Sequence, residues 1–146
     1  MSASEPGNSF GSQGVFNNSS WSGSHLVIAV NGATSTAPGS EEKDANSTTT
    51  SVLFALDGGT GDIIWERQLP GEVMAPITFA NGVGFVGAGT ILEIFDADTG
   101  AVLKKVTTGG TIACPPTVAH GRVAFGDGLA WVFGKPGATL TVLALP

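Results

Sequence analysis

Two blocks of this 146-residue sequence recur at one fixed interval. Residues 76–87 match residues 115–126, with a proline and two glycines at corresponding positions. Residues 54–61 match residues 93–100 at the same interval. A period near 40 residues is typical of one propeller blade, in which four antiparallel strands form a small sheet. We therefore predict an all-β chain in which each 39-residue repeat forms one four-stranded blade.

Each repeat contains a hairpin signature that runs from an aspartate to a glycine. Asp57 and Gly61 bound the first copy, and Asp96 and Gly100 bound the second. The aspartate can accept hydrogen bonds from backbone N–H groups of the turn, and the glycine supplies the positive φ that a tight turn needs. We assign these residues to structure rather than to catalysis or metal binding. The other recurring glycines, also assigned to structure, are Gly82, Gly87, Gly121 and Gly126.

The apolar pattern divides the chain into about three blades, the last of them incomplete, and so predicts a partial β-propeller. We expect residues 1–9 to be a disordered N-terminal segment and residues 10–146 to form the propeller. Residues 31–51 interrupt the first repeat and carry little to bury, so we expect a flexible, solvated insert there. The strands expected in the second repeat are Val73–Phe79, Val83–Val86, Ile91–Phe95 and Val102–Val106.

Three blades are too few for a closed ring, because propellers close with roughly four to eight. An open ring leaves sheet edges unpaired, which favours aggregation. Either residues beyond this sequence or further copies of the chain would complete the ring. Of these two, we expect missing N-terminal blades to be the partner of this segment.

Charge and composition exclude several classes of partner. A net charge of −6 argues against nucleic acid, because there is no surplus of cations to replace the counterions of the phosphate backbone. No run reaches the ~18 apolar residues that a membrane span needs, and the N-terminus lacks the basic start and apolar stretch of a signal peptide. Cys114 is the only cysteine, so no internal disulfide can form. It aligns with Ala75, and we expect a packed core thiol.

The run from Leu56 to Trp65 carries a specific family resemblance. It reads Leu-Asp-x-x-Thr-Gly-x-x-x-Trp and resembles the repeat of quinoprotein alcohol dehydrogenases, in which the tryptophan docks between neighbouring blades. Lys104 stands at the tryptophan position in the next repeat, so that blade departs from the pattern. The glycine-bounded strands at 82–87 and 121–126 also match. The order of features is most similar to the C-terminal part of polyvinyl-alcohol-dehydrogenase-like proteins.

The resemblance implies pyrroloquinoline quinone (PQQ) on the propeller axis, a Ca²⁺ ion that bridges it, and a carboxylate base. The family's catalytic and metal-ligand positions are not recognisable here, so we assign none, and we expect no cofactor on this segment alone. The loops that lead into the innermost strands remain candidates for cofactor binding: Asn17, Asn18, Glu72 and Thr111. The asparagines could equally serve strand-leading turns. Glu72 could be a ligand or a base, or a solvated loop charge.

Two functions fit this pattern. The first is the C-terminal part of a PQQ-dependent dehydrogenase that oxidises an alcohol and passes electrons to a cytochrome c; the segment alone would be inactive, because a partial ring cannot enclose a cofactor. The second is a non-catalytic propeller scaffold for protein–protein interaction, as in outer-membrane assembly lipoproteins. The fold does not decide between them. By resemblance, both place the protein in the bacterial periplasm or outside the cell.

Overall fold

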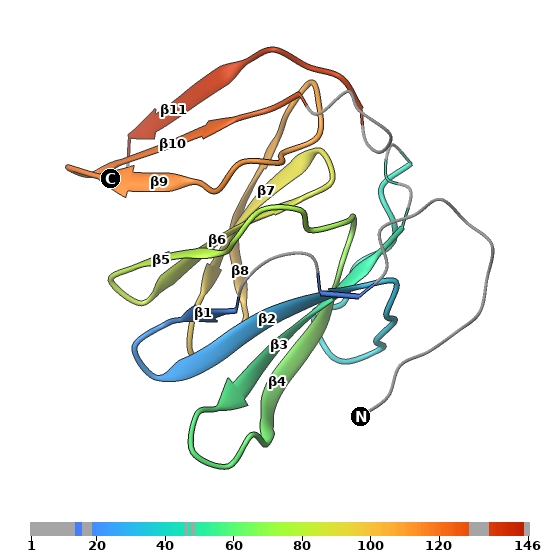
Figure 1. The fold of residues 1–146 in the computed structure, drawn as a ribbon, viewed down its shortest axis with the longest axis vertical. Helices are drawn as coiled ribbons and strands as arrows, with labels where there is room; N and C mark the ends of the chain where they lie inside the picture. The colour runs from blue at the N-terminus through green and yellow to red at the C-terminus, as the bar shows by residue number, and fades with distance from the viewer. Residues whose placement is uncertain (1–13, 16–18, 46, 48, 129–134, 145–146) are drawn as a thin grey trace.

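The computed structural model describes residues 14–15, 19–45, 47, 49–128 and 135–144, and its regular elements there are antiparallel β-strands (Figure 1). No helix among these residues is long and apolar enough to span a membrane. The all-β prediction is therefore confirmed. The strands are β1 (Ser20–Trp21), β2 (His25–Asn31), β3 (Ser51–Asp57), β4 (Ile63–Leu69), β5 (Thr78–Ala80), β6 (Val83–Ala88), β7 (Ile91–Asp96), β8 (Val102–Thr107), β9 (Thr117–Ala119), β10 (Arg122–Gly126) and β11 (Leu140–Ala144).

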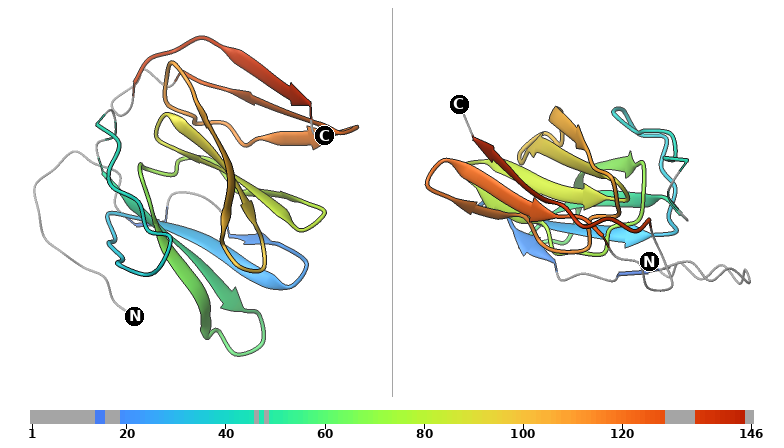
Figure 2. Two further views of the ribbon diagram at one scale, coloured as in Figure 1. Left: turned by 180° about the vertical axis from the view of Figure 1, so that it is seen from behind. Right: turned by 90° about the horizontal axis from the view of Figure 1, so that it is seen from above.

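The strands form three sheets that follow one another along the chain. Sheet orders are β1-β2-β3-β4, β5-β6-β7-β8 and, within the described residues, β9-β10-β11. We call these sheets blade 1, blade 2 and blade 3. The blades stack face to face in a fan, which the two further views also show (Figures 1 and 2). Contacts join the short inner strands β1 to β5 and β5 to β9. This stack confirms a partial propeller.

The strand register shows that the sequence repeat is also a structural repeat. In blade 1, Leu53 lies opposite Ala29, and in blade 2 Leu92 lies opposite Gly87. Because Leu53 and Leu92 are one repeat apart, the two blades present equivalent side chains at equivalent places. Both blades also shift register at the matching point of their outer strand pair, after Ala55 in blade 1 and after Ile94 in blade 2.

The inner strand of blade 2 is shorter than expected. We predicted a strand over Val73–Phe79, but β5 covers only Thr78–Ala80. The N–H of Val73 instead donates to Asn31 Oδ1 at 2.9 Å, and its carbonyl accepts from Asn31 Nδ2 at 3.0 Å. Pro76 has no N–H to give to a ladder. The backbone before Thr78 is thus held by a side chain of blade 1 rather than by a neighbouring strand.

The hydrophobic cores of the protein lie between neighbouring blades. One apolar cluster joins blade 1 to blade 2 and includes Leu53, Ala55, Val86 and Phe95. A second joins blade 2 to blade 3 and comprises Phe85, Leu92, Ile94, Ile112, Val123 and Phe125. Close packing between sheets is what holds such a stack together, at roughly 25 cal/mol for each Å² of apolar surface removed from water.

The insert of the first repeat, in which many described residues are exposed, lies along the outer edge of blade 1 and reaches blade 2. The N–H of Glu41 donates to the carbonyl of Gln68 at 3.2 Å, and the N–H of Asp44 donates to that of Pro70 at 2.7 Å. Thr90 in blade 2 donates its hydroxyl to Asp44 Oδ2 at 2.6 Å. Two backbone groups of the insert thus bond at the outer strand of blade 1, and the side chain of Asp44 bonds across the junction to blade 2.

Candidate functional site

The loop that leads from β4 into β5 places Glu72 in the interior. Its side chain is 0% exposed, so the expected alternative of a solvated loop charge is wrong. The hydroxyl of Ser47 donates to Glu72 Oε2, and the N–H of Glu72 donates back to Ser47 Oγ at 3.1 Å. The carbonyl of Glu72 accepts from the N–H of Gly89 in blade 2 at 2.8 Å. Glu72 therefore fastens the insert to the junction of blades 1 and 2.

A buried polar network continues from this loop into blade 1. Asn31 and Ser51 are the two strand residues that flank the insert, and they are 3% and 0% exposed. The hydroxyl of Ser51 donates to Asn31 Oδ1 and also contacts the carbonyl of Gly71 at 2.9 Å. Because buried polar groups are costly unless they are paired, this network fixes the path of the loop around Gly71.

Thr111 occupies the corresponding place between blades 2 and 3, and it too is 0% exposed. Its N–H donates to the carbonyl of Lys135 at 2.8 Å, and its hydroxyl accepts from the N–H of Lys135 at 2.7 Å. Its carbonyl accepts from the N–H of Gly128 at 2.8 Å. Glu72 and Thr111 thus play the same part in successive repeats. The other two candidates for cofactor binding, Asn17 and Asn18, lie outside the described residues.

A buried ion pair crosses the junction of blades 1 and 2. Arg67 Nη1 on β4 lies 2.7 Å from Glu93 Oε2 on β7, and both side chains are almost fully buried. The guanidinium carbon of Arg67 lies 5.4 Å from the ring centre of Phe95. Lys105 Nζ lies 3.9 Å from Glu93 Oε1 and pairs with Glu41 of the insert. Burial raises the pKa of Glu93 to about 7, and the charge of Arg67 opposes that rise.

Trp65 docks onto the hairpin of the neighbouring blade. A Cβ atom on Gly100 would lie 2.7 Å from the Trp65 ring, so the contact requires a glycine, and Gly100 also has φ +72°. The ring meets Phe95 edge-on at 6.0 Å between centroids. A groove of about 530 Å³ opens beside this dock, lined by β4, the turn at 99–102 and residues 37–39 of the insert.

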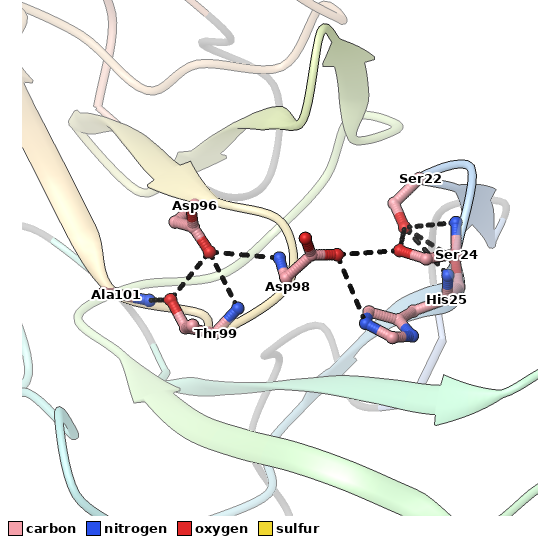
Figure 3. A network of polar contacts seen from close by, with 7 residues as sticks. All are labelled: Ser22, Ser24, His25, Asp96, Asp98, Thr99 and Ala101. Atoms are coloured by element: carbon pink, nitrogen blue, oxygen red, sulfur yellow. Dashed lines mark hydrogen bonds and ion pairs between the residues drawn. The ribbon is translucent and has the colours of Figure 1, made fainter.

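The hairpin on which Trp65 docks also makes exposed polar contacts with blade 1 (Figure 3). Ser24 Oγ donates to Asp98 Oδ1 at 2.8 Å, and His25 Nε2 lies 3.5 Å from that oxygen. Asp98 belongs to the β7–β8 turn, whereas Ser24 belongs to the β1–β2 turn and His25 is the first residue of β2. In the β7–β8 turn, Asp96 Oδ1 accepts from the hydroxyl of Thr99 at 2.7 Å and from its N–H at 2.8 Å. These bonds hold the pKa of Asp96 below its ordinary value.

The hairpin and strand glycines stand at tight places in the blades. The carboxylate of Asp57 accepts from the N–H groups of Thr60 and Gly59, and these bonds lower its pKa. Positive φ values of +78°, +77° and +69° occur at Gly61, Gly82 and Gly121. A Cβ on Gly87 would lie 2.5 Å from Ile112, and one on Gly126 would lie 3.3 Å from the thiol of Cys114.

Cys114 is exposed, so the expectation of a packed core thiol is wrong. Cys114 lies beside the face of blade 3 that points away from blade 2, where its sulfur contacts the carbonyl of Gly126 at 3.4 Å. The aligned residue Ala75 is buried because blade 2 is covered on both faces. Among the described residues nothing covers the corresponding place on blade 3.

The described residues do not suit PQQ or Ca²⁺. Nowhere among them do three or more His, Cys, Asp or Glu side chains gather as a metal site. Glu72 and Thr111, the two described candidates, use their polar atoms to join blades and insert. Calcium prefers six to eight oxygen ligands, and a single carboxylate bound to a serine hydroxyl does not supply them.

The contact partners of Glu93 and Ser47 could not be predicted from the sequence. Glu93 stands in the apolar run Ile91–Phe95, and a charge inside a buried strand signals a paired partner. Nothing in the sequence pairs it with Arg67, because the two lie on different blades. Ser47 belongs to the insert, where a serine among many polar residues gives no signal.

The stacked blades, the shared register and the tryptophan dock define the class: a segment of a PQQ-type β-propeller. The model of the family described as outer membrane protein assembly factor BamB matches this chain over residues 19–103 and 49–138. The chain belongs to this family. No curated protein sequence matches it.

Solved structures share the fold. A europium-containing methanol dehydrogenase has 20% identity and a TM-score of 0.50, with 77% of this chain and 22% of that chain covered. A quinohemoprotein alcohol dehydrogenase from Comamonas testosteroni has 17% identity and a TM-score of 0.50, with 83% and 24% covered. BamB from Moraxella catarrhalis has 15% identity and a TM-score of 0.48, with 79% and 47% covered. The chain thus spans about a quarter of each dehydrogenase and about half of that BamB.

Proposed function

We propose that this chain is part of a non-catalytic, periplasmic propeller that serves as a scaffold for protein–protein interaction in outer-membrane protein assembly. One observation carries the proposal. Glu72 and Thr111, the described residues best placed to hold a cofactor, are fully buried and fasten blades to one another and to the insert. The polar chemistry of this end of the stack is therefore used for structure.

The outer rim supports a binding role. The groove beside Trp65 has apolar walls from Ala37, Pro38, Ile64 and Val102. Ile63 and Ile64 at the start of β4 are 40% and 44% exposed. Among the described residues, the insert bonds to the backbone of β4 at Gln68 and to the side chain of Glu66 through Ser35, both beyond Ile64. Exposed apolar side chains next to an uncovered strand edge are typical of surfaces that bind extended polypeptides.

The experiment compares polypeptide binding with quinone binding. An extended peptide from an outer-membrane β-barrel strand is titrated into the chain and followed by Trp fluorescence, and PQQ with Ca²⁺ is titrated separately by calorimetry. The proposal predicts peptide binding that Ile64→Asp weakens at least tenfold, while Leu103→Asp, on exposed β8, leaves it unchanged. Stoichiometric PQQ binding that Glu72→Gln abolishes, together with no peptide binding, would refute it.

A PQQ-dependent alcohol dehydrogenase is the second candidate. The dock of Trp65 on Gly100 favours it, because the resemblance attributes this contact to quinoprotein alcohol dehydrogenases. In that case cofactor, base and Ca²⁺ ligands come from residues outside the described part, and electrons pass to a cytochrome c. Alcohol-dependent dye reduction by a longer protein that carries this segment, after loading with PQQ and Ca²⁺, tests that reading.

A further inference from the structure

Four charged side chains from three segments of the chain meet at the junction of blades 1 and 2. We call Glu41, Arg67, Glu93 and Lys105 the charge cluster. Arg67 Nη1 lies 2.7 Å from Glu93 Oε2, Lys105 Nζ lies 3.9 Å from Glu93 Oε1, and Lys105 also pairs with Glu41. Arg67 and Glu93 are almost fully buried, whereas the side chains of Glu41 and Lys105 are 16% and 42% exposed. The charge cluster therefore reaches from the interior to the surface, and one of its carboxylates belongs to the insert.

The other described strands around Glu93 bring no titratable group to it. Strand β6, which is hydrogen-bonded to β7, consists of apolar residues and glycines. Strand β3 contributes Leu53 and Ala55 to the apolar cluster at this junction. The charge buried there is thus set by the charge cluster itself. The cluster is neutral when both carboxylates are ionised, and it carries one positive charge when Glu93 is protonated.

The carboxyl groups of Glu41 and Glu93 interact directly. Two ionised carboxylates repel each other and neither can donate a hydrogen bond, whereas a protonated carboxyl group can donate one to an ionised neighbour. Burial is the largest cause that raises the pKa of Glu93 to about 7; the charge of Arg67 opposes the rise, and the charge and hydrogen bonding of Glu41 add to it. A proton on Glu93 therefore favours the position of Glu41 beside it.

Glu41 is also a point where the backbone of the insert meets blade 1. Its N–H donates to the carbonyl of Gln68 at 3.2 Å, and the hydroxyl oxygen of Ser40 accepts from the N–H of Gln68 at 3.0 Å. Farther along the insert, the N–H of Asp44 donates to the carbonyl of Pro70 at 2.7 Å. The attachment of the insert at Glu41 thus combines neutral backbone bonds with a carboxylate that lies against a titrating partner.

We propose that protonation of Glu93 fastens the insert across blades 1 and 2, and that deprotonation of Glu93 loosens the insert around Glu41. Docking of Glu41 raises the proton affinity of Glu93, so by linkage a proton on Glu93 must equally strengthen the docking of Glu41. Because the folded-state pKa of Glu93 is raised to about 7, the docked state is favoured below that pH and loses this support as the pH rises through it.

The loosening is partial, because Lys105 pairs with Glu41 whether or not Glu93 carries a proton. Its effect reaches the rim of the stack. Residues 37–39 lie just before Glu41 in the chain and form one wall of the groove beside Trp65, so movement of the insert around Glu41 moves that wall. The inference is independent of what the groove binds.

Amide hydrogen exchange followed by NMR at about pH 6 and about pH 8, corrected for intrinsic exchange rates, measures the docking of the insert. The amide of residue 41 reports on the contact with blade 1. The amide of Gly32, which donates to the carbonyl of Thr50 at 2.9 Å at the base of the insert, is the internal reference. If Glu41 contributes ~0.5 unit to the raised pKa of Glu93, protection at residue 41 falls ~2.5-fold between the two pH values, while that of Gly32 stays constant.

Matched variants assign the effect to the charge cluster. Glu41→Gln removes the carboxylate that repels Glu93, and Glu42→Gln makes the same change at the next residue, which is exposed. We expect the pH dependence at residue 41 to disappear in Glu41→Gln and to persist in Glu42→Gln. In Glu93→Gln, whose amide cannot ionise and can donate to Glu41, protection should stay at its low-pH level throughout. The carboxyl carbon shift of Glu93 gives a second readout, and its pKa should fall by ~0.5 unit in Glu41→Gln.

Equal protection of residue 41 at both pH values in the wild type overturns the proposal. So does a Glu41→Gln variant that keeps the wild-type pH dependence, or an equal loss of protection at Gly32, because the blade rather than the insert would then be opening. Circular dichroism confirms that each variant is folded. If Glu93→Gln unfolds, the variants at residues 41 and 42 and the titration of Glu93 decide the question. None of these measurements uses a peptide, so their outcome is separate from that of the peptide-binding experiment.

Discussion

Replacing Arg67 with methionine tests the buried pair between blades 1 and 2. The change keeps an unbranched side chain beside Phe95 but leaves Glu93 buried without its close cation. Removal of one partner from a buried ion pair costs ~3–5 kcal/mol when the other charge remains. At about pH 8 we expect the free energy of unfolding to fall by nearly that value. The reason is that Glu93 must then either stay charged without its partner or bind a proton above its pKa.

The raised pKa of Glu93 determines how the loss of stability in the variant changes with pH. Burial raises the folded-state pKa of Glu93 to about 7 from an ordinary 4.5. The folded state thus binds a proton more tightly than the unfolded state, and the associated stability is present below pH 4.5 and lost as the pH rises through 7. At 1.36 kcal/mol per pKa unit this amounts to roughly 3 kcal/mol. Without Arg67 the neutral form is favoured further, so the variant loses less at about pH 5 than at about pH 8.

Urea unfolding followed by tryptophan fluorescence, at both pH values, measures these differences. The groups that face Glu93 are Arg67, Lys105 and Glu41. Lys105→Met is the control, since its partly exposed pair is worth at most ~1 kcal/mol. The double variant Arg67→Met/Glu93→Leu should recover most of the loss, because an apolar pair removes the uncompensated charge. An equal loss at both pH values, or a double variant no more stable than Arg67→Met, would refute the reasoning.

Three further changes test the contacts between blades. Ser47→Ala should cost ~1–3 kcal/mol in urea unfolding, because Glu72 loses a buried hydrogen-bond partner. Gly100→Ala should lower Tm by more than Gly82→Ala, because both have positive φ but only Gly100 lies against the docked tryptophan. Asp96→Asn should lower Tm at neutral pH and reduce the loss of Tm as the pH falls below 3.8, because the wild-type carboxylate has a lowered pKa.

Controls separate these effects from general destabilisation. Thr49→Ala, also in the insert, should leave Tm nearly unchanged, since the contact of its hydroxyl with the carbonyl of Thr50 is long, at 3.4 Å, and local. Equal losses for Ser47→Ala and Thr49→Ala would contradict a specific role for Glu72. Equal losses for the two glycine variants would show that φ alone matters at Gly100. If Tm of the Asp96→Asn variant falls at low pH as steeply as that of the wild type, this aspartate does not contribute to the pH dependence of Tm.

The strands of blade 2 could be predicted from sequence because each is a short apolar run bounded by turn residues. The expected strands at Val83–Val86 and Ile91–Phe95 correspond to β6 and β7 with ends one or two residues longer. The hairpin from Asp96 to Gly100 was predicted for the same reason, since its chemistry is local.

The inter-blade contacts could not be predicted, because they depend on residues far apart in the chain. Glu72 is buried by Ser47 of the insert, 25 residues earlier, and the composition of that insert indicated solvent. Val73 lies outside a strand because its N–H bonds to the side chain of Asn31, 42 residues away. Local pattern fixes a strand, whereas burial of a polar group depends on which partner the stack brings to it.

A crystal structure of the 146-residue chain tests most directly whether each sequence repeat is one stacked blade. We predict that the strands of blade 1 superpose on those of blade 2 with an offset of one repeat, so that Leu53 falls on Leu92, each covered by the next blade. Helices through Thr78–Ala80 or Ile91–Asp96, or sheets that superpose only at another offset and do not stack, would contradict it.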